Sequence, residues 1–150
     1  MFEAMASGAL KGLYVIGENP ADSEADVSHS RKLLADLDLL IVQDIFLTRT
    51  AELADIVLPA PGGWAGSEGT VTSRERSVQR VRAAVGAPPG TRDDHAIIGQ
   101  IAKLLGAKWQ ADTPEALWNE LRSLSPMHLG MSYERLEENE GLQWPCPDLN

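Results

Sequence analysis

The stretch KGLYVIGENPADSEAD, residues 11–26, decides how the fold is read. Within it the apolar run Leu13–Ile16 ends abruptly at Gly17, and a polar, acidic segment follows. A short apolar run that stops at a glycine and an Asn-Pro pair is typical of a buried strand. The chain repeats this arrangement at residues 37–44 and again at residues 55–60. We therefore predict three short strands in this part of the chain.

Helical segments are predicted before and between these strands, at residues 1–10 and 48–54 and from Ser23 onward. Ser23 is the predicted N-cap of a helix that runs to about Asp36, because Asp26 stands three residues further on, as in a capping box. The order β-α-β-α-β is that of a parallel sheet with right-handed crossovers. The sequence thus predicts the α/β class: a Rossmann-like three-layer sandwich with a mainly parallel sheet.

Polar residues stand where each predicted strand ends. The first strand ends at Gly17–Asn19, the second at Gln43–Asp44 and the third at residues 59–60. In a parallel sheet these ends share the carboxyl edge, where open α/β sheets bind ligands. Each position alone is better explained as a loop residue that faces water. An amide and an acid that close an otherwise apolar strand favour a small polar or nucleotide-like ligand.

The character of the chain changes after the third strand. Residues 67–85 alternate in polarity, which predicts an extended segment, an edge strand preceded by a turn at Gly69. Its arginines Arg76, Arg80 and Arg82 fall on one side. They form either a solvated face or a cationic lining for phosphate, since arginine presents a planar fork of donors to phosphate.

Two further helices are predicted from caps and apolar spacing. Residues 91–106 carry an apolar stripe, with Asp93 or Asp94 as the N-cap. Residues 113–124 begin with Thr113 as N-cap, and a proline follows it at the first helical position.

Composition excludes several classes of function. The formal net charge of -9 argues against binding to nucleic acid, and no apolar run approaches the ~20 residues of a membrane span. The first residues lack the basic and apolar regions of a signal peptide. The single cysteine, Cys146, fits a reducing compartment. We expect a cytoplasmic protein that neither binds nucleic acid nor inserts into a membrane.

Five segments together resemble the large (alpha) subunit of molybdenum/tungsten bis-pterin oxidoreductases, the molybdopterin oxidoreductase family, and within it the formate dehydrogenase branch. The resemblance covers nearly the whole chain in the family's order. The segments are GENPADSEAD (17–26), LDLLIVQDIFLTRTAELADIVLPA (37–60), EGTVTSRERSVQRVR (68–82), RDDHAIIGQIAKLLG (92–106) and SYERLEENEGLQWPCP (132–147).

The resemblance implies a role in holding a cofactor. Residues 1–125 would be part of the α/β domain that cradles the guanosine end of one molybdopterin guanine dinucleotide, and residues 126–150 an irregular C-terminal extension. The first strand end would lie near ribose and phosphates, and the second would line the same cofactor. By matched position the cofactor-binding residues are Gly17, Glu18, Asn19, Ser23, Gln43, Asp44 and Asp94.

The resemblance assigns to Asp94 the reading of guanine. A carboxylate accepts both N1–H and the N2 amino group of guanine, whereas adenine presents an acceptor at N1 and is repelled. By analogy with bidentate base readout, the discrimination is on the order of 1–3 kcal/mol. The alternative role of Asp94 is the N-cap of its own helix.

The sequence lacks the parts of such an enzyme that perform its chemistry. It has no Cys-x-x-Cys run for an iron–sulfur cluster, and no cysteine followed by histidine to hold the metal. We expect molybdenum or tungsten and the cluster to be bound by other domains of a longer parent subunit, with electron-transfer subunits as further partners. The parent would oxidise formate to carbon dioxide with loss of two electrons, and this chain alone would be inactive.

Two alternatives remain open. One is a non-catalytic α/β module that binds a nucleotide or a protein. The other is a piece of a related parent, a nitrate reductase or the large subunit of an NADH–quinone oxidoreductase.

Overall fold

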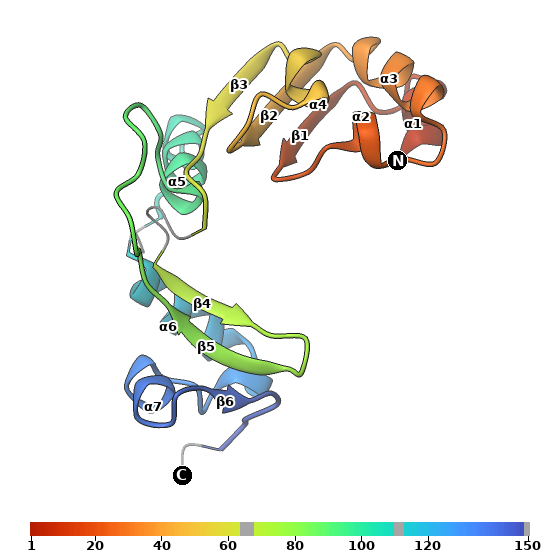
Figure 1. The fold of residues 1–150 in the computed structure, drawn as a ribbon. Helices are drawn as coiled ribbons and strands as arrows, with labels where there is room; N and C mark the ends of the chain where they lie inside the picture. Colours follow the sequence, from red (N-terminus) through yellow and green to blue (C-terminus); the bar gives the residue numbers. More distant parts are fainter. Residues whose placement is uncertain (64–67, 110–112, 149–150) are drawn as a thin grey trace. The chain divides into compact units, whose positions relative to one another are not determined.

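A three-stranded parallel sheet forms the centre of the first part of the chain (Figure 1). The computed structural model describes residues 1–63, 68–109 and 113–148. Strands β1 (Gly12–Ile16), β2 (Leu39–Asp44) and β3 (Ile56–Pro59) lie in the order β1-β2-β3. Both neighbouring pairs are parallel. The predicted strands and their parallel arrangement are confirmed.

The chain divides into two compact units. The first comprises Met1–Pro61 and Pro88–Arg92, and the second comprises Gly62–Ala87 and Asp93–Asn150. Pro88–Arg92 thus returns to the first unit, where the Arg92 amide donates to the Pro59 carbonyl at 3.2 Å.

Short helices precede and connect the strands of the first unit: α1 (Phe2–Ala6) comes before β1, and α2 (Pro20–Ser23), α3 (Val27–Ala35) and α4 (Arg49–Glu52) lie between strands. The prediction that Ser23 caps α3 is wrong. Pro20 starts a separate helix that ends at Ser23, and Glu24 is extended with ψ 150°. Asp26 caps α3 instead, and its side chain accepts from the His29 amide at 3.0 Å.

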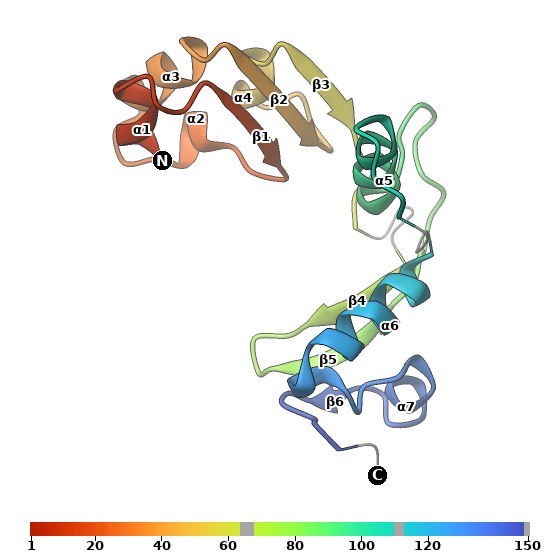
Figure 2. The same cartoon turned by 180° about the vertical axis from the view of Figure 1, so that it is seen from behind.

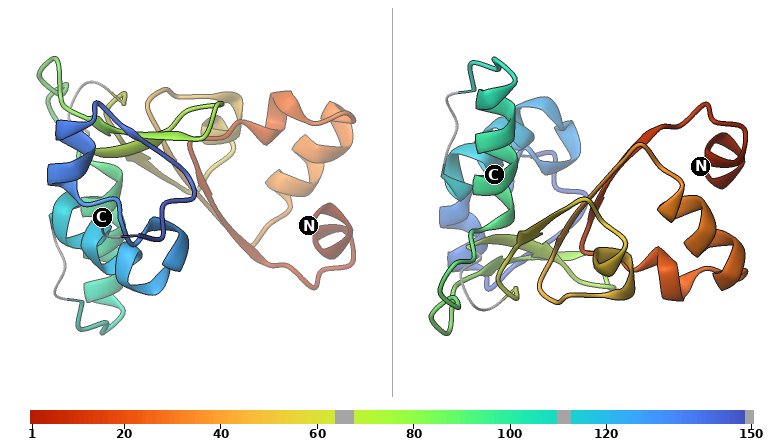
Figure 3. Two further views of the ribbon diagram at one scale, coloured as in Figure 1. Left: turned by 90° about the horizontal axis from the view of Figure 1, so that it is seen from below. Right: turned by 90° about the horizontal axis from the view of Figure 1, so that it is seen from above.

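Figures 2 and 3 show the helices of the first unit along one face of the sheet, and the core side chains come from both layers. Strand alternation turns the opposite face outward, where Ile16 is 42% and Ile56 45% exposed. Among the described residues of this unit, the helices cover one face, so it supplies two of the three predicted layers. The core residues are Met5, Val15, Ala21, Leu33, Leu34, Leu40, Val42 and Ala51.

The second unit is built on an antiparallel sheet of β4 (Gly69–Thr72), β5 (Ser77–Val81) and β6 (Leu142–Gln143). The predicted single extended strand is therefore wrong, because residues 73–76 reverse the chain. The Arg76 amide donates to the Ser73 carbonyl at 2.9 Å, and Arg76 is left-handed with φ 65°. The predicted start at residue 67 lies outside the described residues.

Both predicted helices of the second unit are confirmed, as α5 (Asp94–Leu104) and α6 (Pro114–Leu124). Asp93 occupies the N-cap position of α5, although its side chain makes no capping hydrogen bond. The Thr113 hydroxyl caps α6 by accepting from the Ala116 amide at 3.2 Å.

Residues 126–148 are ordered into elements, so the prediction of an irregular extension is wrong for this part. A 3-10 helix, η1 (Pro126–His128), precedes α7 (Tyr133–Glu138) and β6. The segment is mostly polar, yet it packs on α6, where the Trp118 indole donates to the Met131 carbonyl at 2.6 Å. The core of this unit comprises Val78, Trp118, Met131 and Leu136.

Arg80 is not part of a solvated face. Its side chain is 9% exposed, and its Nε donates to Glu137 Oε1 at 2.9 Å. Its guanidinium carbon lies 3.3 Å from the centre of the Tyr133 ring, and Arg82 also pairs with Glu137. Hydrogen bonds from Arg82 and Arg80 hold the pKa of the Glu137 carboxyl below its ordinary value. The sequence could not separate Arg80 from Arg82, which is half exposed.

We expect Tyr133→Phe to raise the free energy of unfolding by about 1 kcal/mol. The Tyr133 hydroxyl is buried without a hydrogen-bond partner of good geometry among the described residues, because the nearby Arg80 guanidinium lies over the ring. Burial raises the pKa of its phenol, and Arg80 opposes that rise. Urea denaturation followed by circular dichroism measures the change. Tyr14→Phe is the matched control and should be destabilising, because the Tyr14 hydroxyl donates to Gln43 Oε1. A loss of stability in Tyr133→Phe equal to that in Tyr14→Phe would contradict the prediction.

Candidate functional site

The ends of the three parallel strands meet at one edge of the sheet. Ile16 pairs in register with Gln43, and Asp44 with Pro59. Just beyond the strands, the Gly17 amide donates to the Gln43 carbonyl at 2.9 Å, and the Ala60 amide donates to the Asp44 carbonyl at 3.1 Å. The predicted common edge is thus confirmed, and Gly17 and Asp44 lie on adjacent strand ends.

Gly17 turns the chain away from β1 in a left-handed conformation, with φ 63°. A side chain at this φ is strained, which explains the glycine. A Cβ at this position would have no neighbouring atom within 4 Å. The backbone of the turn is therefore open to an approaching ligand.

A cavity of about 370 Å³ lies beside β1 and the turn that follows it. This volume is within the range of small-molecule pockets. Two predicted residues, Glu18 and Ser23, line it, together with Tyr14 and Glu24, which the sequence did not single out. Carboxylates accept hydrogen bonds, and hydroxyls both donate and accept them, so this lining suits a ligand that carries hydroxyl groups.

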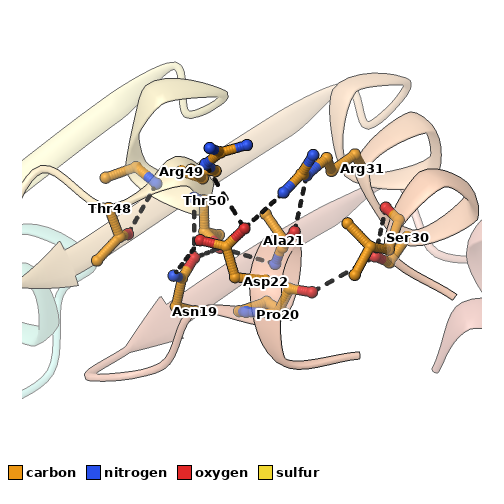
Figure 4. Close-up of polar contacts among 11 residues, drawn as sticks. Asn19, Pro20, Ala21, Asp22, Ser30, Arg31, Thr48, Arg49 and Thr50 are labelled. Carbon is orange, nitrogen blue, oxygen red and sulfur yellow. Dashed lines mark hydrogen bonds and ion pairs between the residues drawn. The ribbon is translucent and has the colours of Figure 1, made fainter. Parts of the chain in front are cut away.

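The Asn19 side chain is engaged within the protein (Figure 4). Its Oδ1 accepts from the Thr50 amide at 3.2 Å and from the Thr50 hydroxyl at 2.7 Å. Its Nδ2 donates to Asp22 Oδ2 at 2.9 Å. The Thr50 hydroxyl in turn accepts from the Ala21 amide at 3.0 Å. Asn19 therefore joins the turn after β1 to α4, the helix after β2.

Asp22 forms the exposed side of the same network (Figure 4). Its Oδ1 lies 2.5 Å from Arg31 Nη2 and 3.7 Å from Arg49 Nε. The hydrogen bond from Asn19, with the Arg31 and Arg49 guanidinium groups, holds the pKa of the Asp22 carboxyl below its ordinary value. Arg31 Nε also donates to the Ala21 carbonyl at 2.8 Å. Helix α2 is thus held from both neighbouring helices.

The two polar residues that end β2 differ in environment. The Gln43 side chain is fully buried and accepts from the Tyr14 hydroxyl, so it is engaged within the protein although it shares the sheet face of Ile16. Asp44 is half-buried, and its Oδ1 accepts from the Phe46 amide at 3.1 Å. Phe46 itself is 71% exposed. Of the two, Asp44 is the one whose carboxylate is accessible at the edge.

Asp94 belongs to the second unit, where it is the first residue of α5 and is exposed. The six other predicted residues belong to the first unit. The role of Asp94 in reading guanine therefore stays a prediction, separate from the edge of the parallel sheet.

Thr50 is the residue of this region that sequence reasoning missed. It is fully buried, yet it stands in a short segment, TRTAELA, that was interpreted only as a helix. Its partners Asn19 and Ala21 are about thirty positions away, and local patterns carry no signal of such a contact.

Across residues 1–63, 68–109 and 113–148, no group of three or more His, Cys, Asp or Glu side chains is arranged to hold a metal ion. Over the same ranges, no helix has the length and apolar character needed to cross a bilayer.

The chain is similar in sequence to proteins that are named formate dehydrogenases. The chain is 47% identical over 143 residues to the F420-dependent formate dehydrogenase subunit alpha of Methanocaldococcus jannaschii, covering 94% of this chain and 21% of that protein. It is 39% identical over 145 residues to formate dehydrogenase H of Escherichia coli, covering 97% and 20%. The chain thus spans about a fifth of the length of these relatives.

A solved structure shares the fold. Acetylene hydratase from Pelobacter acetylenicus superimposes with a TM-score of 0.72 at 23% identity, covering 95% of this chain and 19% of that one. The family model of the molybdopterin oxidoreductases matches residues 1–104, more than half of the chain. The chain therefore belongs to the molybdopterin oxidoreductase family.

Proposed function

We propose that the carboxyl edge of the parallel sheet cradles the nucleotide end of the cofactor, molybdopterin guanine dinucleotide, in a subunit that resembles the formate dehydrogenase alpha subunit. The observation that carries the proposal is the meeting of Gly17 and Asp44 on adjacent strand ends, beside an open backbone turn. Open α/β sheets bind nucleotides in this position.

Asp44 is the residue we assign to the ribose. An acidic residue that closes the second strand of a dinucleotide-binding unit accepts hydrogen bonds from ribose hydroxyls. Asp44 closes β2, and its Oδ1 is fixed by the Phe46 amide at 3.1 Å, which orients the carboxylate. A ribose hydroxyl donates to the Oδ2 atom in this assignment.

Glu18 and Ser23 are assigned to the polar groups of the same nucleotide, because both line the cavity beside β1. Gly17 contributes its open backbone. Gln43 and Asn19 act indirectly: the buried Gln43 amide orients Tyr14, which also lines the cavity, and Asn19 is engaged by Thr50. We assign these two to positioning rather than to contact with the ligand.

Asp94 is proposed separately to select guanine over adenine. Asp94 is an exposed carboxylate at the start of a helix, and a carboxylate can accept from the Watson–Crick edge of guanine. This assignment rests on the resemblance in the sequence RDDHAII and on the chemistry of the base.

In the whole subunit, we propose, formate is oxidised to carbon dioxide, and two electrons and a proton are released. The cofactor, with molybdenum or tungsten, supplies this redox chemistry when it is bound. The residues of this chain bind and orient the far end of the cofactor, while the metal ligand and iron–sulfur cluster are held by the rest of the subunit. The chain alone is then inactive, and its partners are the other domains of the parent and its electron-transfer subunits.

The test is a titration of the chain with GDP, with ADP as the control ligand, followed by backbone amide chemical shifts. We expect GDP to change the amide chemical shifts of residues 17–19, 21–23, 43 and 44; residue 20 is a proline and has no amide proton. Asp44→Asn should weaken GDP binding about tenfold, because a hydrogen bond to a charged acceptor is lost. Asp94→Asn should reduce the preference for GDP over ADP.

Asp38→Asn is the matched control. Asp38 is an exposed acid that precedes β2, and it pairs with Lys11 at 3.7 Å at the opposite, amino end of the strand. It should bind GDP like the unchanged chain. No GDP-dependent shifts in a folded sample, or an equal loss in Asp38→Asn, would contradict the proposal.

A further inference from the structure

The hydroxyl of Thr50, in the helix after β2, forms hydrogen bonds to the turn after β1. Thr50 is fully buried, and its hydroxyl both donates to Asn19 Oδ1 at 2.7 Å and accepts from the Ala21 amide at 3.0 Å. We infer that Thr50 is a positioning residue that holds the ligand-facing turn in its binding geometry. The inference rests on the proposed function, whose nucleotide site it deepens.

The hydroxyl is the chemical requirement at this position. A group there must donate to a carbonyl oxygen and accept from an amide at the same time, and hydroxyls do both. The Thr50 amide adds a bond to Asn19 Oδ1 at 3.2 Å. Since Thr50 lies in the first turn of α4, its amide has no partner within the helix, and Asn19 supplies one. The Asn19 side-chain oxygen therefore accepts from both donors of Thr50, its amide and its hydroxyl.

Hydrogen bonds hold the turn after β1 at both of its ends, and these two bonds are its fixed points. At one side the Gly17 amide is bonded to the Gln43 carbonyl at 2.9 Å, and at the other Asn19 is bonded to Thr50. Glu18 is the only residue between them, and it lines the cavity. The partner residues, Gln43 and Thr50, lie in β2 and in α4, and β2 also carries Asp44. Thr50 thus sets where Glu18 lies relative to Asp44.

The exposed ion pairs of the same network are expected to contribute less to the position of the turn than the bonds to Thr50. The Asp22 pairs with Arg31 and Arg49 involve side chains that are 37–62% exposed, so water and salt screen them. The bond from the Ala21 amide to Thr50 is buried and the bonds to Asn19 are partly buried, so water and salt screen them less. They are expected to dominate the position of the turn.

The experiment compares Thr50→Val with Thr50→Ser. Valine keeps the shape but removes the hydroxyl, whereas serine keeps the hydroxyl. In the ligand-free chain, we expect Thr50→Val to speed hydrogen exchange of the Ala21 amide about tenfold. Its dissociation constant for GDP should rise about tenfold, and Thr50→Ser should stay within about twofold of the unchanged chain on both measures.

Ser30→Ala controls for a general loss of stability. Ser30 is also a buried hydroxyl next to α2, and it donates to the Val27 carbonyl at 3.0 Å and the Pro20 carbonyl at 3.4 Å. Among the described residues, these two carbonyls are its hydrogen-bond acceptors, whereas the Ala21 N–H donates to Thr50. We expect a lower free energy of unfolding without weaker GDP binding.

Where Thr50→Val does not fold, Asn19→Ala replaces it. The Asn19 side chain is less buried, and its removal breaks the same bond to Thr50. It should weaken GDP binding by about the same factor.

Each result has a distinct meaning. An unchanged chain that does not bind GDP contradicts the proposed function, while the exchange of the Ala21 amide still tests the Thr50 contact. GDP affinity that is equal in Thr50→Val, Thr50→Ser and the unchanged chain overturns the inference. An equal loss of affinity in Ser30→Ala also overturns it, because the effect is then general stability.

Discussion

Trp118→Ala is expected to lower the free energy of unfolding by about 3–5 kcal/mol, the range for a buried tryptophan replaced by alanine. Trp118 is the largest residue in the small core of the second unit, and it is 9% exposed. The substitution opens a cavity in the cluster that Trp118 forms with Val78, Met131 and Leu136. It also removes the indole donor of the Met131 carbonyl, which lies 2.6 Å away. Both losses act on a core of few residues.

Urea denaturation followed by circular dichroism measures this change. Trp109→Ala is the control, since Trp109 is 56% exposed and belongs to neither buried cluster among the described residues. It should change the free energy of unfolding by less than about 0.5 kcal/mol. Equal costs for the two substitutions would show that the Trp118 packing described above does not stabilise the unit.

The second large effect is expected from Gly130→Ala, a loss of about 3 kcal/mol, the upper end for overpacking. A Cβ at Gly130 would lie 1.9 Å from the Asp148 carbonyl oxygen and 2.9 Å from that of Cys146. These are backbone atoms, so the segment 146–148 must move. The movement breaks the bond from the Gly130 amide to the Cys146 carbonyl and the bond from Arg135 to Asp148.

Gly99→Ala is the matched control, because it makes the same chemical change inside α5. No atom lies within 4 Å of a Cβ at Gly99. Alanine is the better helix former, so stability should rise by about 0.5–1 kcal/mol. The two substitutions should therefore have opposite signs. A stabilising Gly130→Ala would mean that the C-terminal segment does not pack against residue 130.

The parallel sheet was predictable because its signal is local. An apolar run followed by a glycine or an acid marks β1 and β2, and the parallel order follows from the helices between them. The β4–β5 hairpin was missed because its turn contains no glycine or proline. Arg76 takes the left-handed conformation there, which is uncommon for arginine. Similarly, Ser23 and Asp26 are both good caps, and the extended Glu24 between them decides which one acts.

The candidate site was predictable in position but not in the role of each side chain. Gly17 and Asp44 stand where strand ends are expected. Asn19 and Gln43 were predicted to bind the ligand, yet the first is engaged by Thr50 and the second by Tyr14. Which polar side chains turn inward depends on partners distant in sequence, and a single sequence does not contain that information.

The return of Pro88–Arg92 to the first unit limits how the chain can be divided for expression. Three chain crossings join the two units, so neither is a continuous stretch of sequence. A gene truncated after Pro61 would encode the three parallel strands but omit the donor of the bond from Arg92 to Pro59. A version of the first unit that keeps this bond therefore needs Pro88–Arg92 joined to it through a short artificial linker in place of residues 62–87.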